Sequence, residues 1–126
     1  MTLKKILLIE DEPLIQTSLK RLLEKRGAEV YVESSGNQAI KLIKSSDFDR
    51  IICDLMLQDI SGFDILEEAK QRYSTGEIRD KFVIITAYSS AQVLEKAAGY
   101  NCQVISKPFD DLNRVLDIFM QEEGSN

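Results

Sequence analysis

The sequence predicts an α/β fold built on a doubly wound, five-stranded parallel sheet. Short apolar runs alternate along the chain with longer stretches in which apolar residues recur at helical spacing. Three of these runs, at 6–9, 51–53 and 83–85, are continuously apolar, which is typical of strands covered on both faces. Because strand-to-helix-to-strand connections are right-handed, the alternation favours a parallel sheet of order 2-1-3-4-5 with helices on both sides.

Each element has a local reason in the sequence. The expected strands are about 5–9, 29–32, 50–54, 82–86 and 103–106. The expected helices are about 13–27, 36–45, 61–69, 89–99 and one that starts at 110. Pro13 is accepted in a first helical turn, Gly27 suits a helix end, and Ser61 can cap the third helix. The polar stretch 73–81 is expected to be a solvated loop.

Length and composition predict one globular domain, 1–126, with a core of about 4–121. A hydrophobic content of 44% is enough to bury a core, and a net charge of −5 makes direct binding of nucleic acid unfavourable. The apolar runs are too short to span a bilayer, and the first residues lack a signal-peptide cleavage pattern. We therefore expect a cytoplasmic protein that does not enter the membrane.

The cysteine and histidine content excludes several kinds of site. The chain has no histidine and only two cysteines, Cys53 and Cys102, so neither a Cys/His zinc site nor a Cys-His or Ser-His catalytic pair can form. The strand order separates Cys53 from Cys102 by about 10 Å, which is too far for a disulfide. Both cysteines are interpreted as packing residues.

Acidic side chains follow the first and third strands. Glu10, Asp11 and Glu12 end the first run, and Asp54 ends the third. An acidic run alone is usually a solvated loop or the acidic first turn of a helix. However, neighbouring parallel strands bring Asp54 beside this run, where two carboxylates about 4 Å apart repel by roughly 4 kcal/mol at an effective dielectric of 20. A divalent cation removes that cost, and ligation by oxygen alone indicates Mg²⁺, or Mn²⁺ in its place.

Two other strand ends contribute different groups. Lys107 follows the fifth strand, where its ammonium can compensate the carboxylates or a phosphoryl oxygen. Pro108 restricts the backbone after Lys107 and could hold a cis bond. Thr86 ends the fourth strand, and its hydroxyl could bond a phosphoryl oxygen. These groups converge on one sheet edge and predict a site for a metal ion and a phosphoryl group.

The strand-end residues, in this order, resemble those of the response regulator receiver domain (CheY-like) of bacterial two-component signalling. The matching residues are Glu10-Asp11, Asp54, Thr86-Ala87 and Lys107-Pro108. The resemblance covers the chain from Lys4 to about Met120 and implies a flavodoxin-like (βα)5 fold. No catalysis is implied beyond phosphorylation and dephosphorylation of the domain itself.

The resemblance also implies a role for each matching residue. Asp54 would accept the phosphoryl group, and Mg²⁺ would bind Asp11 and Asp54 directly, with Glu10 assisting through water. The Met56 backbone carbonyl would be a further metal ligand. Thr86 would hold the phosphoryl group, and Lys107 would pair with Asp54 and then with the phosphate.

The implied partners lie on both sides of the signalling step. Because this chain has no histidine, the donor would be a phosphohistidine on a sensor histidine kinase or a histidine phosphotransfer protein. Phosphorylation would reshape the face formed by the fourth expected helix, the strand 103–106 and the last helix. That face would bind a downstream protein, a separate output domain or a second copy of the chain as a homodimer.

Three positions depart from the family pattern or vary within it. Gln58 stands where the family usually has proline, so the loop after Asp54 has lost one source of stiffness. Val104 replaces the usual Tyr or Phe, so an aromatic flip cannot report the phosphorylated state there. Tyr88 occupies a variable position, and we expect it to shield the acyl phosphate from water; the alternative is an ordinary exposed aromatic.

Two other classes of protein fit part of this pattern. A Mg²⁺-dependent phosphohydrolase with an aspartyl intermediate would need an acid-base aspartate two residues after the nucleophile, where this chain has Met56. A pseudo-receiver would keep the fold and interact without phosphorylation, but the complete set of acceptor, acidic pair, hydroxyl and lysine argues against it.

Overall fold

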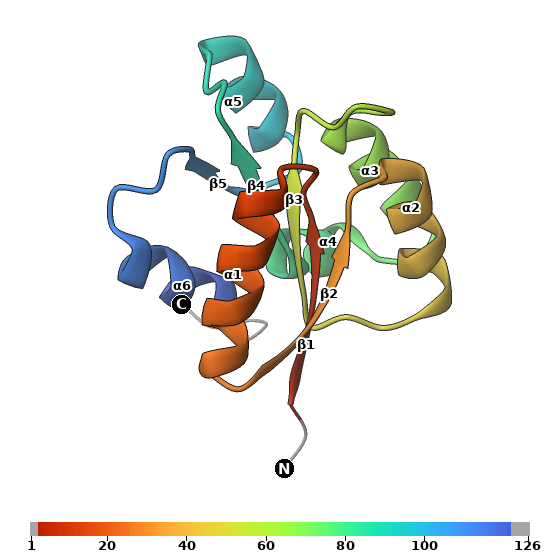
Figure 1. The fold of residues 1–126 in the computed structure, drawn as a ribbon. Helices are drawn as coiled ribbons and strands as arrows, with labels where there is room; N and C mark the ends of the chain where they lie inside the picture. The colour runs from red at the N-terminus through yellow and green to blue at the C-terminus, as the bar shows by residue number, and fades with distance from the viewer. Residues whose placement is uncertain (1–2, 122–126) are drawn as a thin grey trace.

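A computed structural model describes residues 3–121 and has the predicted parallel sheet at its centre (Figure 1). Its five strands are β1 (Lys4–Ile9), β2 (Ala28–Glu33), β3 (Arg50–Asp54), β4 (Phe82–Thr86) and β5 (Gln103–Ser106). They pair in parallel in the order β2-β1-β3-β4-β5, which confirms the predicted fold class. The carboxyl ends of β1, β3 and β4 therefore lie side by side.

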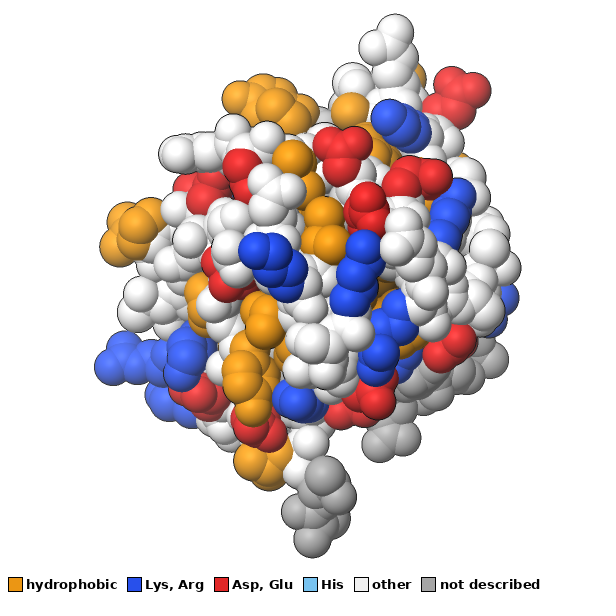
Figure 2. All heavy atoms as spheres, turned by 90° about the vertical axis from the view of Figure 1, so that its right-hand side faces the viewer, with side chains coloured by type: hydrophobic (Ala, Val, Ile, Leu, Met, Phe, Trp, Pro, Cys, Tyr) orange, Lys and Arg blue, Asp and Glu red, His pale blue; other side chains and the backbone are white. Residues whose placement is uncertain are grey.

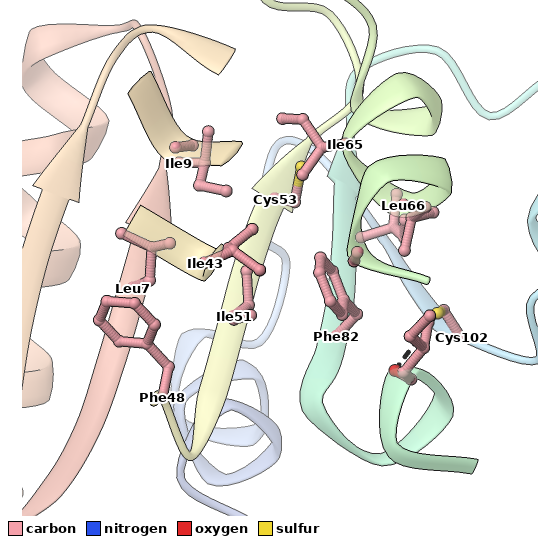
Figure 3. Close-up of a cluster of buried hydrophobic side chains, with 14 of the residues drawn as sticks. Leu7, Ile9, Ile43, Phe48, Ile51, Cys53, Ile65, Leu66, Phe82 and Cys102 are labelled. Atoms are coloured by element: carbon pink, nitrogen blue, oxygen red, sulfur yellow. Dashed lines mark hydrogen bonds between the residues drawn. The ribbon is translucent and has the colours of Figure 1, made fainter. Parts of the chain in front are cut away.

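Helices cover both faces of the sheet (Figure 1). They are α1 (Pro13–Lys25), α2 (Gly36–Ser45), α3 (Gly62–Ala69), α4 (Thr75–Lys81), α5 (Ala91–Ala98) and α6 (Leu112–Met120). Apolar residues of α1 and α6 pack against one face, and those of α2, α3 and α4 pack against the other. The strands alternate their side chains between these layers, so that Ile52 faces α1 and α6 while Ile51 and Cys53 face α2 and α3 (Figure 3).

The helix α4 corrects the expected loop at 73–81. Ser74 accepts a hydrogen bond from the Glu77 amide at 3.2 Å, and the Ser74 amide donates to the Glu77 carboxylate at 3.1 Å. This reciprocal capping box is a helix-start signal that the high polarity of the segment obscured. Its one buried apolar residue, Ile78, packs the short helix against the sheet.

The other boundaries shift only slightly. The last helix begins at Leu112, because Asp111 caps it through the Arg114 amide and Asp110 precedes the cap. Gly27 follows α1 with a φ of 92°, a conformation that suits glycine and ends the helix as predicted. Cys53 and Cys102 are buried and unpaired, as predicted.

The opposite edge of the sheet is held by a buried cation. Arg50 donates to the carbonyl oxygens of Asp80 at 2.6 Å, of Phe119 at 3.4 Å and of Ile118. One guanidinium thus donates to carbonyl groups at the carboxyl ends of both α4 and α6. This contact fixes α6 against the start of β3.

The outer face of α2 and α3 is a mixed, solvated surface. Basic and acidic side chains are interspersed there (Figure 2). Lys44 of α2 and Glu68 of α3 form an ion pair of 2.9 Å across this face. Among residues 3–121, no helix combines the length and apolar character needed to cross a membrane.

Candidate functional site at the carboxyl edge of the sheet

The strand ends bring an ammonium among carboxylates. The Lys107 Nζ lies 2.9 Å and 3.2 Å from the two carboxylate oxygens of Glu10 and 3.0 Å from Asp54 Oδ2. It also lies 3.3 Å from Glu12 Oε1. Glu10 and Asp54 are buried, and the Lys107 side chain is only 8% exposed, so this is a desolvated charge cluster rather than a surface ion pair.

The environment shifts the ionisation of this cluster. Burial raises the pKa of Glu10 from 4.5 to about 7, although its hydrogen bond to Lys107 acts in the opposite direction. Burial opposes the charge on Lys107, but hydrogen bonds to Glu10 and Asp54 and the charges of both raise the pKa of Lys107 above its ordinary value. The lysine therefore stays protonated, while burial disfavours the ionised form of Glu10 and a further cation would favour it.

One backbone amide and the Lys107 ammonium orient the Asp54 carboxylate. Asp54 Oδ1 accepts from the Met56 amide at 3.0 Å, while Oδ2 accepts from Lys107. Behind Asp54, a Cβ at Gly62 would lie 2.8 Å from the Asp54 carbonyl oxygen, so only glycine fits there without displacement. The loop after Asp54 thus folds back tightly against it.

The acidic group fits a hard divalent cation. Carboxylate oxygens of Glu10, Glu12 and Asp54 all lie within 4.8 Å of one another. An oxygen-only donor set is what Mg²⁺ prefers. Glu12 was not among the predicted metal ligands, although it directly follows the acidic pair Glu10-Asp11 in the sequence.

The predicted ligand Asp11 lies outside this three-carboxylate group. It lines an open pocket of about 340 Å³ together with Ser34, Ser35, Gln58 and Asp59. Asp11 therefore faces the loop after Asp54 from the β2 side. Direct ligation by Asp11, and by the Met56 carbonyl, stays a prediction.

A comparison with known proteins shows the family of the chain. The model of the response regulator receiver domain matches residues 6–119. The chain belongs to this family. Its receiver domain is 33% identical over 109 residues to the response regulator ArlR of Staphylococcus saprophyticus, with 84% of this chain and 46% of that protein covered. It is 31% identical over 119 residues to the transcriptional regulatory protein CpxR of Klebsiella pneumoniae, with coverage of 92% and 48%.

The receiver domain spans about half the length of the curated relatives it matches. Among solved structures, it resembles a CheY-like receiver domain protein of Methanospirillum hungatei JF-1, with a TM-score of 0.81, 28% identity and coverage of 93% and 91%. It also resembles the response regulator TrrA of Thermotoga maritima in complex with Mg²⁺-BeF, with a TM-score of 0.73, 27% identity and coverage of 94% and 100%.

Most of the remaining predicted residues of this receiver domain end or follow the strands β4 and β5. Thr86 is fully buried; its hydroxyl accepts from the Tyr88 amide at 3.0 Å and donates to the Tyr88 carbonyl at 3.3 Å. Tyr88 is 63% exposed, and Ala87 is also exposed. The Lys107–Pro108 peptide bond is cis.

Val104 lies apart from the charged group. It is half-buried on β5 and lines a cavity of about 250 Å³ between β5 and α6. An aliphatic residue therefore stands on the face for which a role in partner binding was predicted.

Proposed function

We propose that this receiver domain accepts a phosphoryl group on Asp54 and uses the modification as a switch. The donor is a phosphohistidine on a sensor histidine kinase or a histidine phosphotransfer protein, and the cofactor is Mg²⁺, with Mn²⁺ as a substitute. The observation that carries the proposal is the ammonium of Lys107 held between the buried carboxylates of Glu10 and Asp54. A buried carboxylate positioned by a lysine and a backbone amide is suited to act as a nucleophile.

Phosphoryl transfer to Asp54 requires mainly that the reacting groups are positioned and that their negative charge is compensated. An Asp54 oxygen forms a bond to phosphorus while the phosphorus–nitrogen bond breaks, and the electron pair leaves on the imidazole. Phosphoryl transfer depends on neutralising charge on the equatorial oxygens. Mg²⁺, when bound by Glu10, Asp11, Asp54 and the Met56 carbonyl, supplies part of that charge; Lys107 supplies the rest.

The remaining site residues would respond to the phosphorylated state of Asp54. The Thr86 hydroxyl turns toward the phosphoryl oxygen, and the change passes to the face of α5, β5 and α6. There the domain binds a downstream protein, a separate output domain or a second copy. The setting that we propose is cytoplasmic, with no direct binding of nucleic acid.

The test is intact-mass measurement after incubation with acetyl phosphate and Mg²⁺. The parent protein should gain one phosphoryl group, and Asp54→Asn should gain none. No gain by the parent would support the pseudo-receiver alternative. Steady-state hydrolysis of phosphate esters would support the phosphohydrolase alternative, because we propose no enzymatic activity beyond the domain's own phosphorylation and dephosphorylation.

Tyr88 has a proposed part in the lifetime of the product. Its backbone is bonded to Thr86 at the end of β4, and the residue is largely exposed. We expect the ring to limit the access of water to the acyl phosphate, so Tyr88→Ala should lose phosphate faster than the parent. An equal rate of loss would leave Tyr88 as an ordinary exposed aromatic.

A further inference from the structure

The loop after Asp54 is closed at its base and carries Met56. The Gly62 amide donates to the Leu55 carbonyl at 3.0 Å, and Met56 forms an isolated antiparallel bridge with Ser61. Because the Met56 amide donates to Asp54, movement of this loop would move a hydrogen-bond donor of the acceptor carboxylate. At the tip of the loop, Gln58 stands where the family usually has proline.

The tip is held by Asp59, whose carboxylate binds the start of α2. Asp59 Oδ1 accepts from the Gly36 amide at 2.9 Å, and Oδ2 accepts from the Asn37 amide at 3.0 Å. Oδ2 also accepts from the Ser35 hydroxyl at 2.8 Å and from the Asn37 side-chain amide at 3.1 Å. One exposed carboxylate thus connects the loop to three consecutive residues of another segment.

Packing next to Asp59 makes the contact specific. A Cβ at Gly36 would lie 2.9 Å from Ile60 Cδ1 and 3.3 Å from Asp59 Oδ1, so the loop tip rests directly on the helix backbone. The amides of Asn37 and Gly36 lower the pKa of Asp59 well below its usual range. The contact is therefore made by an ionised carboxylate at a helix N-terminus, where negative charge is favoured.

We infer that Asp59 is a positioning residue of the phosphorylation site, which fixes the loop tip to α2 and thereby holds Met56 for Asp54 and for a bound cation. The inference rests on the proposed function. Four residues separate Asp54 from Asp59, and both ends of that span are anchored, at Lys107 and at α2 respectively. The anchor supplies the restraint that proline would otherwise give to this loop.

The test compares Asp59→Ala with Asp49→Ala. Asp49 is a matched control, because it is also exposed and accepts from a backbone amide, that of Lys5, at 2.7 Å, but it lies at the opposite edge of the sheet. Two quantities are measured: hydrogen exchange of the Met56 amide in metal-free protein, by NMR, and the Mg²⁺ dissociation constant, by calorimetry. Asp59→Ala should weaken Mg²⁺ binding by about tenfold, as loss of an outer-shell partner does, and should accelerate Met56 exchange.

Asp59→Asn keeps an oxygen acceptor, and we expect it to recover most of the Met56 protection. The inference would be overturned if Asp59→Ala had the same Met56 amide exchange rate and the same Mg²⁺ affinity as the parent protein, whatever its melting temperature. Equal losses in Asp49→Ala would overturn it too, since they would indicate a general effect of stability. Failure of the proposed function is seen separately, as the absence of a mass gain by the parent protein.

Discussion

Replacement of Lys107 by methionine tests the charge balance of the site most directly. The change keeps an unbranched side chain but removes the ammonium that lies within 3.2 Å of Glu10 and Asp54. Carboxylate oxygens of these two residues lie within 4.8 Å of each other. At that separation and an effective dielectric of 20, their repulsion is about 3.5 kcal/mol. Breaking a buried ion pair by removing one partner typically costs about 3–5 kcal/mol.

We therefore expect metal-free Lys107→Met at pH 8 to lose about 3 kcal/mol of unfolding free energy, or roughly 10 °C in Tm. The loss should shrink at pH 5, where Glu10 can take up a proton. Urea unfolding followed by far-UV circular dichroism measures it. Lys20→Met is the control, because Lys20 forms an exposed ion pair with Glu24 that is worth about 0.3–0.5 kcal/mol. A Lys107→Met protein as stable as the control at pH 8 would refute the electrostatic reasoning.

Three further substitutions test other parts of the structure. Burial raises the pKa of Glu10 from 4.5 to about 7, so the protonated carboxyl group contributes to the unfolding free energy at low pH, and this contribution is lost as the pH rises from 4.5 through 7. The Tm difference between the parent and Glu10→Gln should therefore change over this pH window. Tm curves that run parallel for the two proteins would contradict this. Gly62→Ala places a Cβ 2.8 Å from the Asp54 carbonyl oxygen, so urea unfolding should show a loss of about 1–3 kcal/mol, and parent stability would argue against a tight fit. Arg50→Met leaves buried carbonyl groups of α4 and α6 without their donor, and should cost about 3 kcal/mol and increase amide exchange at the end of α6; unchanged exchange there would count against the anchor.

The sheet could be predicted because its signals are redundant. Continuous apolar strands, right-handed connections and helix-end residues all favour the same order of strands. The helix α4 could not be predicted from apolar periodicity, because a seven-residue helix with one buried isoleucine has almost none. Its capping box was the available signal, and the polarity of the segment outweighed it.

The core of the site was predictable for a similar reason. Glu10 and Lys107 each follow a strand directly and Asp54 is the last residue of β3, so the sheet itself brings them together. The side-chain positions of residues one or two places further along depend on the backbone of the loop, and the register of the strands does not determine that backbone. That is why Glu12 joins the cluster while Asp11 lines the neighbouring pocket. The contact of Asp59 with α2 joins two loops and leaves no periodic signal in the sequence.

The two-way hydrogen bonding of Thr86 with Tyr88 has a mechanical consequence. Its hydroxyl both accepts from and donates to the backbone of a residue just before α5. Rotation of this hydroxyl toward Asp54 must break both bonds, which frees one amide and one carbonyl at the same moment. These two backbone groups of Tyr88 then need new hydrogen-bond partners. A side-chain rotation at the end of β4 therefore directly changes the backbone of the segment that leads to α5.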